Sequence, residues 1–424
     1  MARIVILGAG IGGLPAAYEL RSSLGKSHEI TMVNPVDTFQ FTPSNPWVVV
    51  GWREPEHIVV RLKPPLERKG IRLIVSTAQA VKPAERVVEL ANGERLEYDY
   101  LLITTGPKLA FDEIPGLGPE GGYTQSVCTL EHAKTARLAY ETFLKNPGPI
   151  VVGAVQGASC FGPAYEFAMI LDKDLRKRKL RHKVPMTFIT SEPYIGHLGL
   201  GGVGDSRGML ESIMRARHIK WITNAKVKEI TTGQLTAVEH DADGKPVRDH
   251  QLPFSFGMLL PAFKGVDALM GIEGLVNPRG FVTIDAHQRN AKYPNVYSAG
   301  VCVAIAPPEP TPVPTGVPKT GYMIESMVSA VVANIKADIQ GKPVRATATW
   351  NAVCLADMGD SGIAFVALPQ IPPRNVTWTK SGYWVHLAKI AYEKYFLRKM
   401  RIGSNETFYE RYMLKLLGIM RLTG

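Results

Sequence analysis

Short apolar runs that end in glycine turns recur along the chain and predict parallel β-strands followed by helices. Residues 3–7 form such a run, and the glycine-rich residues 8–13 and an alanine-containing segment follow it. Residues 29–33, 98–103 and 295–299 are further apolar runs. Strands buried on both faces of a parallel sheet have continuous apolar sequences, and the connecting helices cover them. The pattern therefore predicts an α/β fold with Rossmann-like sheets.

The first glycine run has the spacing of a dinucleotide-binding loop. Gly8, Gly10 and Gly13 form Gly-x-Gly-x-x-Gly between a strand and a helix. These glycines serve a tight turn, close approach to a pyrophosphate and helix packing, and the helix amides point at the phosphates. Asn34 ends the second strand, where an acidic residue usually binds the ribose hydroxyls. Asn34 is neutral but can still donate and accept hydrogen bonds.

A second strand, glycine turn and helix start occupy residues 149–170, but this loop keeps only one of the three glycines. Gly153 is followed by Val155 and Ala158 at the other two places. A side chain at the middle place would crowd a pyrophosphate. Glu192 follows the next strand, near where a nicotinamide ribose would bind, but one acid after a strand is common. We therefore expect a second Rossmann-like unit whose NAD(P) site is degenerate.

The order of these patterns predicts two nested units and a tail. Residues 1–107 and 255–345 form the first unit, which the pattern of strands suggests is a flavin domain, and residues 108–254 form the second. Residues 346–424 form a C-terminal region.

Two segments of the C-terminal region have the composition of basic amphipathic helices. Residues 382–400 mix aromatic and apolar side chains with lysine and arginine, and residues 408–421 place Phe408, Tyr412 and Leu416 on one helical stripe. Such helices lie in the membrane interface. The alternative, a packing helix with a solvated face, has equal weight at this point.

Composition narrows the possible classes of binding partner only in part. The chain has 424 residues, is 45% hydrophobic and carries a formal charge of +11, which favours an anionic partner. Its basic run at residues 173–183 lacks interleaved aromatic residues, so we expect a solvated helix end and no nucleic-acid site. The sequence has no run of about 18 or more apolar residues, the length that a helix needs to span a bilayer. The first strand begins too early to leave room for a signal peptide, so we expect none. We expect peripheral membrane association at the cytoplasmic face.

The four cysteines indicate redox chemistry and no metal site. Cys128, Cys160, Cys302 and Cys354 lie far apart and form no Cys-x-x-Cys pair. Cys160 lies in the second glycine loop, at a helix start whose dipole is expected to lower the thiol pKa. Cys354 opens the C-terminal region. Two cysteines beside a flavin can accept a nucleophile at sulfur and pass two electrons to the ring.

The sequence resembles, essentially end to end, the sulfide:quinone oxidoreductases of the flavoprotein disulfide-reductase superfamily. The resemblance is carried by residues 8–13, 40–47, 158–166, 189–197, 314–325 and 351–360. It implies FAD as cofactor, sulfide and a membrane quinone as substrates, and neither NAD(P) nor a metal. It also implies contact of the C-terminal helices with an anionic lipid surface, and it leaves a homo-oligomer open.

The resemblance further implies roles for individual residues. Cys160 and Cys354 match the redox-active pair and Cys128 a third essential cysteine, whereas Cys302 has no counterpart and is interpreted as structural. The acid or base candidates are His132, His197 and Glu166. The residues expected to contact FAD are Gly8, Ala9, Gly10, Gly12, Gly13, Asn34, Thr105, Gly106, Gly300, Lys319 and Thr320. The residues expected to contact quinone are Lys389, Tyr392 and Tyr409.

Two of these expectations have particular reasons. Lys319 precedes a helix that starts near Thr320, so its charge and the helix dipole would stabilise an anionic reduced flavin. The family's usual Gly-Asp signature appears here as Gly300-Val301, which removes one expected contact with the cofactor.

Three other functions remain open from sequence. A type II NADH:quinone oxidoreductase would need an intact second glycine loop and no redox cysteines. A flavin-dependent polysulfide redox sensor would not need the aromatic tail. A flavocytochrome subunit would reduce a haem protein and no quinone.

Overall fold

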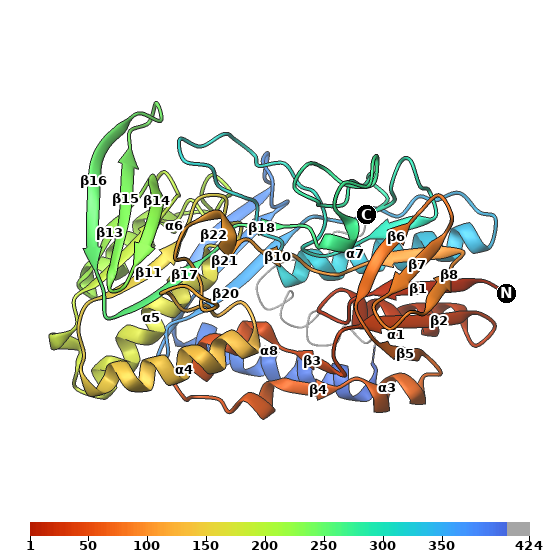
Figure 1. Ribbon diagram of the computed structural model, residues 1–424, viewed down its shortest axis with the longest axis horizontal. Coiled ribbons are helices and arrows are strands. Elements are labelled where there is room, and N and C mark those ends of the chain that lie inside the picture. Colours follow the sequence, from red (N-terminus) through yellow and green to blue (C-terminus); the bar gives the residue numbers. More distant parts are fainter. Residues whose placement is uncertain (405–424) are drawn as a thin grey trace.

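The computed structural model describes residues 1–404, so the predicted helix at 408–421 and the quinone residue Tyr409 lie outside the described part. Figure 1 shows an elongated molecule, with the first unit at one end and the second unit at the other. Strands β20 to β22 and helices α7 and α8 lie toward the middle.

The first unit is built on a five-stranded parallel sheet in the order β19-β9-β1-β2-β5. Its strands are β1 Arg3–Leu7, β2 Glu29–Asn34, β5 Arg72–Val75, β9 Tyr100–Ile103 and β19 Val296–Ser298. Helices α1 Gly13–Leu24 and α7 Gly321–Ile339 pack against each other beside it. Because β19 pairs with β9, the chain returns to this sheet after forming the second unit. The predicted nested arrangement of strands is confirmed.

The second unit has a four-stranded parallel sheet in the order β13-β12-β11-β17. Its elements are β11 Ile150–Ala154, α5 Gly162–Lys177, β12 Met186–Thr190, α6 Ser206–Ala216, β13 Ile219–Ile222 and β17 Phe256–Leu260, with α4 Leu130–Lys145 beside the sheet. Strand β17 is fully buried and pairs with β11 along its whole length. The sheet therefore extends beyond residue 254, where the sequence predicted the unit to end.

Smaller elements join and decorate the two units. The small sheets comprise β3 Thr38–Gln40 with β4 Val59–Arg61, β6 Ala78–Lys82 with β7 Val87–Leu90 and β8 Arg95–Glu97, β10 Lys108–Leu109 with β18 Phe263–Lys264, and β14 Ala225–Thr231 with β15 Gln234–His240 and β16 Pro246–Pro253. The short helices are α2 Asn45–Val49 and α3 Lys63–Arg68. The 3-10 helices are Thr42–Ser44, Pro55–Ile58, Phe111–Glu113, Arg181–Lys183 and Asp267–Leu269. Strands β14 to β16 project from the second unit (Figure 1).

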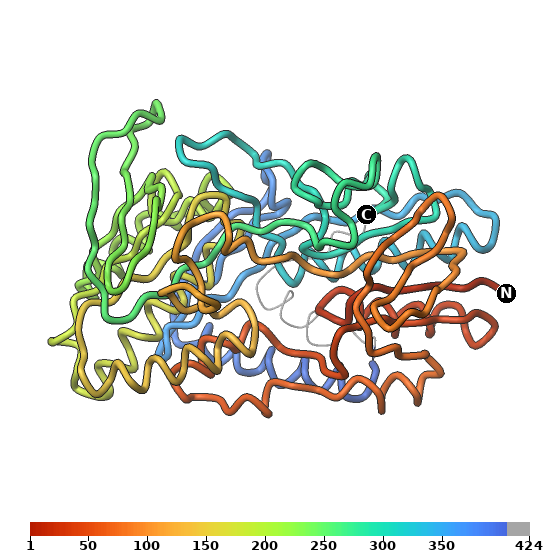
Figure 2. Tube along the Cα trace, in the orientation of Figure 1, coloured from red at the N-terminus to blue at the C-terminus, as the bar shows by residue number. Residues whose placement is uncertain are grey.

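The C-terminal region begins with a sheet that the sequence analysis did not predict. Strands β20 Ala352–Asp357, β21 Gly362–Leu368 and β22 Val376–Ser381 form an antiparallel sheet, and helix α8 Tyr383–Ile402 follows. In Figure 2 the last described part of the trace, in blue, runs beside the red segment that contains residues 38–61. Among the described residues, no helix is long and apolar enough to cross a membrane.

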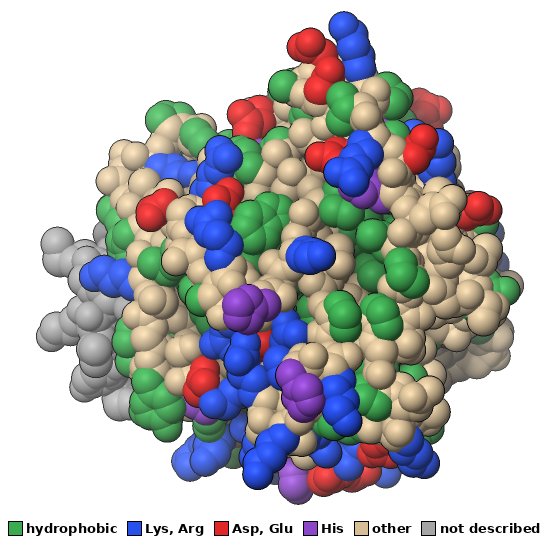
Figure 3. Space-filling view, turned by 90° about the vertical axis from the view of Figure 1, so that its left-hand side faces the viewer, with side chains coloured by type: hydrophobic (Ala, Val, Ile, Leu, Met, Phe, Trp, Pro, Cys, Tyr) green, Lys and Arg blue, Asp and Glu red, His purple; other side chains and the backbone are tan. Residues whose placement is uncertain are grey.

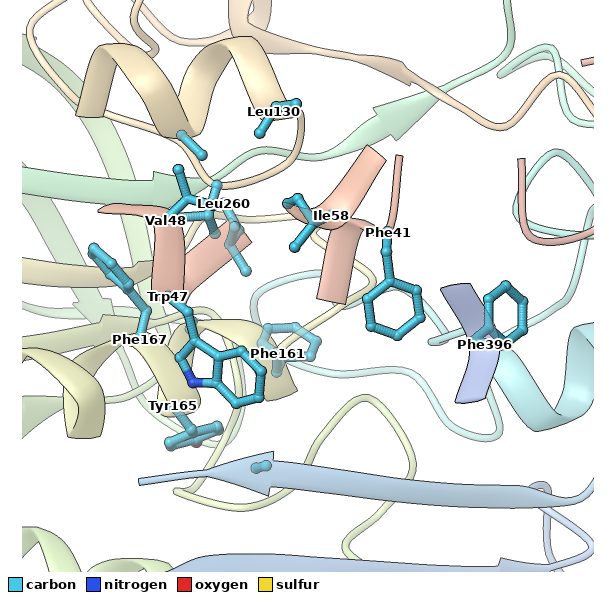
Figure 4. Packing of buried hydrophobic residues seen from close by; sticks show 14 of the residues in the cluster. Phe41, Trp47, Val48, Ile58, Leu130, Phe161, Tyr165, Phe167, Leu260 and Phe396 are labelled. Carbon is cyan, nitrogen blue, oxygen red and sulfur yellow. The ribbon is translucent and has the colours of Figure 1, made fainter. Parts of the chain in front are cut away.

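Helix α8 packs one face into the main hydrophobic core. Phe396 lies 5.9 Å from Phe39 and 5.5 Å from Phe41 between ring centroids. Figure 4 shows Phe41 and Phe396 facing each other, with Trp47 and Tyr165 further along the same core. Burial of such aromatic side chains stabilises a fold by about 2 kcal/mol or more each. The helix is therefore held to the body of the protein along its apolar face.

Candidate functional site

The first glycine loop combines packed glycines with one that borders open space. A Cβ atom on Gly8 would lie 2.4 Å from the carbonyl oxygen of Thr104, and one on Gly13 would lie 1.9 Å from the carbonyl oxygen of Gly8. A Cβ atom on Gly10, in contrast, would meet nothing within 4 Å. Packing therefore explains Gly8 and Gly13, whereas Gly10 leaves room for a ligand to approach the backbone.

Two more open glycines lie at the same edge of the sheet. Gly106 follows β9 and Gly300 follows β19, and a Cβ atom on either would meet nothing within 4 Å. Both strands are parallel to β1, so their carboxyl ends meet at one edge. Ligands of open α/β sheets bind at that edge. Gly106 and Gly300, together with Gly10, form a cradle of three open glycines that fits a dinucleotide such as FAD. Gly12 is part of the packing here, because its Cβ position is 3.4 Å from Ile324 on α7.

Asn34 holds the shape of this loop. Its Oδ1 accepts a hydrogen bond from the Ala9 amide at 2.9 Å, and its Nδ2 donates to the Val36 carbonyl at 2.7 Å. The side chain is buried. Both polar groups are therefore engaged within the protein, a positioning role that the sequence analysis did not foresee.

Three cysteines from three different elements come together. Cys160 lies just before α5, Cys354 lies on β20, and Cys128 lies just before α4. The charges of Cys354 and Cys128 would both raise the pKa of the Cys160 thiol, which places Cys160 near each of the other two thiols. All three are unbridged thiols in the structure. We call Cys128, Cys160 and Cys354 the cysteine cluster.

The expectation that a helix dipole lowers the Cys160 pKa is wrong for this structure. Burial raises the pKa of Cys160 and of Cys354 to about 12 and that of Cys128 to about 11. The apolar surroundings disfavour the thiolate more than the helix start favours it. Lys319 opposes the rise at Cys160 through its positive charge.

Lys319 connects the cysteine cluster with the first unit. Burial lowers its pKa to about 8, while Cys302 and Cys160 act in the opposite direction. Its Nζ lies 4.9 Å from the Phe281 ring centroid. The next residue, Thr320, caps α7 by accepting a hydrogen bond from the Met323 amide at 3.4 Å. The predicted helix start at Thr320 is confirmed.

Cys302 lies apart from the cluster, inside the first unit. Its thiol donates to the carbonyls of Ile103 and Ala299 at 3.5 and 3.4 Å, and the side chain is buried. A hydrogen bond also joins it to Thr105. These contacts support the interpretation of Cys302 as a structural residue at the end of β9 and β19.

Glu166 and Lys389 form a buried ion pair between α5 and α8. The two side chains are 7% and 6% exposed, and the Lys389 ammonium group donates to Glu166 Oε1. The backbone amide of Asp357 also donates to Glu166, and the Lys389 Nζ lies 5.3 Å from the Trp47 ring centroid. Burial raises the pKa of the Glu166 carboxyl to about 7, although Lys389 lowers it. A predicted acid or base and a predicted quinone residue are thus direct partners.

A second set of buried polar residues surrounds this pair and was missed in the sequence. Asp357 accepts a hydrogen bond from Trp47 Nε1 at 2.8 Å and contacts His386 Nδ1 at 2.6 Å. Glu393 binds Arg53 Nε at 2.9 Å and accepts from Ser44. His386, Lys389 and Glu393 follow a spacing of three and four residues, the signal that could have identified one polar face of α8 as turned inward.

The two predicted histidines bind other partners. His132 Nε2 lies 3.6 Å from Glu120, and its ring contacts Phe111. His197 is buried, bonds Glu309 through Nε2 at 2.9 Å and accepts from the Gly199 amide at 3.2 Å. Burial lowers the pKa of His197. Within residues 1–404, no hydrogen bond joins either ring to a cysteine.

Tyr392 brings α8 close to the start of α7. Its hydroxyl would lie 3.4 Å from a Cβ atom on Gly321, the first residue of α7. Its ring lies 5.8 Å from Phe41 and 5.6 Å from Phe396. Tyr392 therefore lies beside Gly321, the residue that follows Lys319 and Thr320 in the sequence. Lys389, in contrast, contacts Glu166.

Glu192 and Gln156, which follow β12 and β11 of the second unit, form internal hydrogen bonds. Glu192 is fully buried and accepts from the Tyr165 hydroxyl at 2.7 Å and the Leu198 amide at 2.6 Å. Gln156 forms two hydrogen bonds with the backbone of Val227, at 2.9 and 3.0 Å. The carboxylate that the sequence placed near a nicotinamide ribose is engaged inside the protein.

Comparisons with known proteins agree with this geometry. Residues 2–323 match the model of the pyridine nucleotide-disulphide oxidoreductase family. A sulfide-quinone reductase from Aquifex aeolicus is 42% identical over 97% of this chain and 94% of its own length. The chain belongs to the sulfide:quinone oxidoreductase family. Relatives in this family include the mitochondrial sulfide:quinone oxidoreductase of Dictyostelium discoideum, which is 24% identical over 81% of this chain and 72% of its own length.

Solved structures show the same relationship. The crystal structure of the Aquifex aeolicus sulfide:quinone oxidoreductase has a TM-score of 0.93 at 41% identity and covers 99% of this chain and 96% of that one. NDH2 from Plasmodium falciparum has a TM-score of 0.72 at 13% identity over the full length of both chains, which shows a shared fold alone. Membership of the sulfide:quinone oxidoreductase family thus rests on sequence as well as structure.

Proposed function

We propose that the protein oxidises sulfide at Cys160 and Cys354 and passes two electrons through bound FAD to a membrane quinone. The observation that carries this proposal is the grouping of Cys128 and Cys354 around Cys160, together with Lys319, whose charge interacts with Cys160 and with Cys302 of the first unit. A structural role alone would not require three thiols from distant parts of the chain to converge.

The sulfur chemistry follows from a disulfide between Cys160 and Cys354 in the oxidised enzyme. Hydrosulfide attacks one sulfur of this disulfide, a new S–S bond forms, and the old bond breaks to release the other cysteine as thiolate. The proton of hydrosulfide passes to the surroundings. Two electrons then leave the sulfur pair, and an S–S bond that includes the added sulfur closes. Further turnovers lengthen the chain, and Cys128 takes part in release of the polysulfide.

The cradle supports FAD as the cofactor. Gly10, Gly106 and Gly300 leave space where its phosphates and ribityl chain would lie, and Val301 stands where the family usually has an acid. Bound FAD supplies two-electron transfer between the sulfur pair and quinone. Lys319 and the amino end of α7 would stabilise negative charge on the reduced cofactor. The positive charge of Lys319 is partly lost above its lowered pKa of about 8.

NAD(P) and metal ions have no part in the proposal. The carboxylate of Glu192 is fully engaged by internal donors, and Gln156 is bonded to Val227. A nicotinamide nucleotide would have to break these contacts to bind. We therefore expect that NADH does not reduce the enzyme.

The quinone site is proposed beside α8, from Lys389, Tyr392 and, outside the described residues, Tyr409. The outer face of α8 exposes Tyr383, Trp384 and Leu387. Aromatic and aliphatic side chains on a helix with basic residues favour the membrane interface. We propose peripheral attachment to an anionic lipid surface at the cytoplasmic face, where α8 brings the enzyme to membrane quinone.

The proposal is tested by following the flavin spectrum of the purified protein without oxygen. Sulfide should bleach the flavin, a short-chain quinone should restore it, and NADH should have no effect. Bleaching by NADH and not by sulfide would refute the proposal in favour of an NADH dehydrogenase. Cys160→Ala and Cys354→Ala should each retain FAD and lose sulfide oxidation, whereas Cys302→Ser serves as the matched control and should turn over normally.

A further inference from the structure

A cavity of about 640 Å³ lies between α5, α8, the loop after α2 and the turn after β20. Two tryptophans, Trp47 and Trp52, line it together with Arg53, Lys173, Arg176 and Lys177. None of the cysteine cluster or the open glycines belongs to its lining. Its volume is in the range of about 300 to 1,000 Å³ typical of small-molecule sites.

The cavity wall carries more positive charge than its neighbours neutralise. Lys173 pairs with Asp360 at 2.6 Å, and Arg176 pairs with Asp172 at 2.9 Å. Asp172 is shared, because Arg181 and Arg217 bind the same carboxylate at 2.6 and 2.9 Å. Lys177 has no ion pair within residues 1–404. Charges that are only partly compensated at a cavity attract an anion.

The buried acids nearby do not reverse this charge. Glu393 is engaged by Arg53 and Ser44, and Asp357 by Trp47 and His386. Lys173, Arg176 and Lys177 belong to the basic run at residues 173–183, which the sequence analysis interpreted as a solvated helix end. Figure 3 looks onto this end of the molecule and shows Lys and Arg side chains gathered over its lower half.

The position of the cavity indicates the kind of anion. His386 and Ile390 of α8 form part of its lining. The exposed apolar side chains Tyr383, Trp384 and Leu387, which are 59%, 37% and 49% exposed, lie within about two turns of them on the same helix. The cavity therefore combines cations with an apolar wall beside the helix face that is proposed to contact the membrane.

We propose that this cavity binds the phosphate head group of an acidic phospholipid. Arg176 and Lys177 contact the phosphate oxygens, since neither is fully neutralised. Trp52 and Ile390 pack against the glycerol and the first acyl carbons. The proposal rests on the membrane attachment stated under the proposed function, and it adds a defined lipid site to the general attraction of a basic helix. A bound lipid would fix the angle at which α8 meets the bilayer.

Soluble short-chain phosphatidylglycerol separates this site from surface charge. The full-length protein with FAD is titrated calorimetrically with dihexanoylphosphatidylglycerol, dihexanoylphosphatidylcholine or inorganic phosphate, all below micelle-forming concentrations. We expect phosphatidylglycerol to bind at least about tenfold more tightly than either other compound, because it alone combines a net negative charge with acyl chains. Equal affinity for inorganic phosphate would overturn the proposal and indicate a free-anion site.

Matched variants complete the test. The double variant Arg176→Gln/Lys177→Gln should weaken phosphatidylglycerol binding at least about tenfold. Lys226→Gln/Arg248→Gln removes the same charge from exposed positions on β14 and β16 and should leave affinity unchanged. Similar loss in both, or loss in neither, would overturn the proposal. An unchanged FAD content checks that each variant is folded.

Vesicle flotation distinguishes failure of this site from failure of membrane attachment. Neutral phosphatidylcholine vesicles should carry the unaltered protein and Arg176→Gln/Lys177→Gln equally, because the apolar face of α8 is intact in both. If neither floats on vesicles of any composition, the attachment proposed for α8 fails, while the calorimetric result still decides the lipid site.

Discussion

The buried pair of Glu166 and Lys389 allows a prediction whose sign depends on pH. Lys389→Met keeps much of the side chain's length and removes its charge, so Glu166 loses its ion-pair partner in a site where its side chain is 7% exposed. Removing one member of a buried ion pair costs about 3 to 5 kcal/mol when the other must stay charged. The carboxyl can avoid this cost by keeping a proton.

The pKa of Glu166 determines the pH range in which the carboxyl keeps this proton. Burial raises this pKa to about 7 while Lys389 lowers it, so loss of Lys389 moves the pKa higher still. A folded-state pKa above that of the unfolded chain means that stability falls as pH rises between the two values. In the unaltered protein this fall ends near pH 7, whereas in Lys389→Met it continues above pH 7. The extra loss is about 1.4 kcal/mol per pH unit, or about 2 to 3 kcal/mol between pH 7 and pH 9.

Urea unfolding of the FAD-bound protein, followed by circular dichroism at about pH 6 and about pH 9, measures this difference. We expect Lys389→Met to match the unaltered protein near pH 6 and to be about 2 to 3 kcal/mol less stable near pH 9. Glu166→Gln/Lys389→Met should recover most of that loss, because no charge remains in the site. Lys394→Met, at an exposed position of α8, is the control and should have little effect at either pH. An equal loss at both pH values, or a double variant as unstable as Lys389→Met alone, would refute this reasoning.

Three further outcomes follow from the site. Gly10→Val places a branched side chain in the space left for the cofactor and should lower FAD occupancy strongly. The absorbance ratio of flavin to protein measures this occupancy. Full occupancy would contradict the assignment of Gly10 to the FAD cradle. Lys319→Met should stabilise the FAD-free protein by about 3 kcal/mol near pH 7, since burial lowers the pKa of that lysine from 10.5 to about 8. That gain should shrink as pH rises from about 8 toward 10.5, where the unfolded lysine also loses its proton; a gain independent of pH would count against it. Cys128→Ala should still form reduced flavin with sulfide but release polysulfide slowly, which product analysis by chromatography would test; normal release would remove Cys128 from that step.

Local sequence determined the frame of this protein. The run at Arg3–Leu7 and the glycines after it predicted a strand, a turn and a helix, because period and turn chemistry act over a few residues. The strand before Glu192, which is β12 Met186–Thr190, and the α7 start after Thr320 were predicted for the same reason. Cys160 stood out because it lies in a loop at the position of a nucleotide-binding loop, and this loop keeps only one of the three expected glycines.

Element boundaries were less well determined. Strand β17 Phe256–Leu260 belongs to the second unit because its register pairs Ile150 with Phe256, a relation between residues about a hundred positions apart. The sheet before α8 was missed because β20, β21 and β22 have antiparallel partners that local patterns do not identify. Pairing of this kind is a property of the whole chain.

Tertiary structure alone decided the electrostatics of the site. The thiol pKa of Cys160 rises because three elements bury it, which outweighs the helix dipole that the sequence suggested. Glu166 and Lys389 are 223 positions apart, and only the packing of both α5 and α8 against β20 makes them partners. Periodicity and turn preferences are encoded within a few residues. Desolvation of a side chain depends on which distant segments exclude water from it, and only the tertiary structure shows which segments these are.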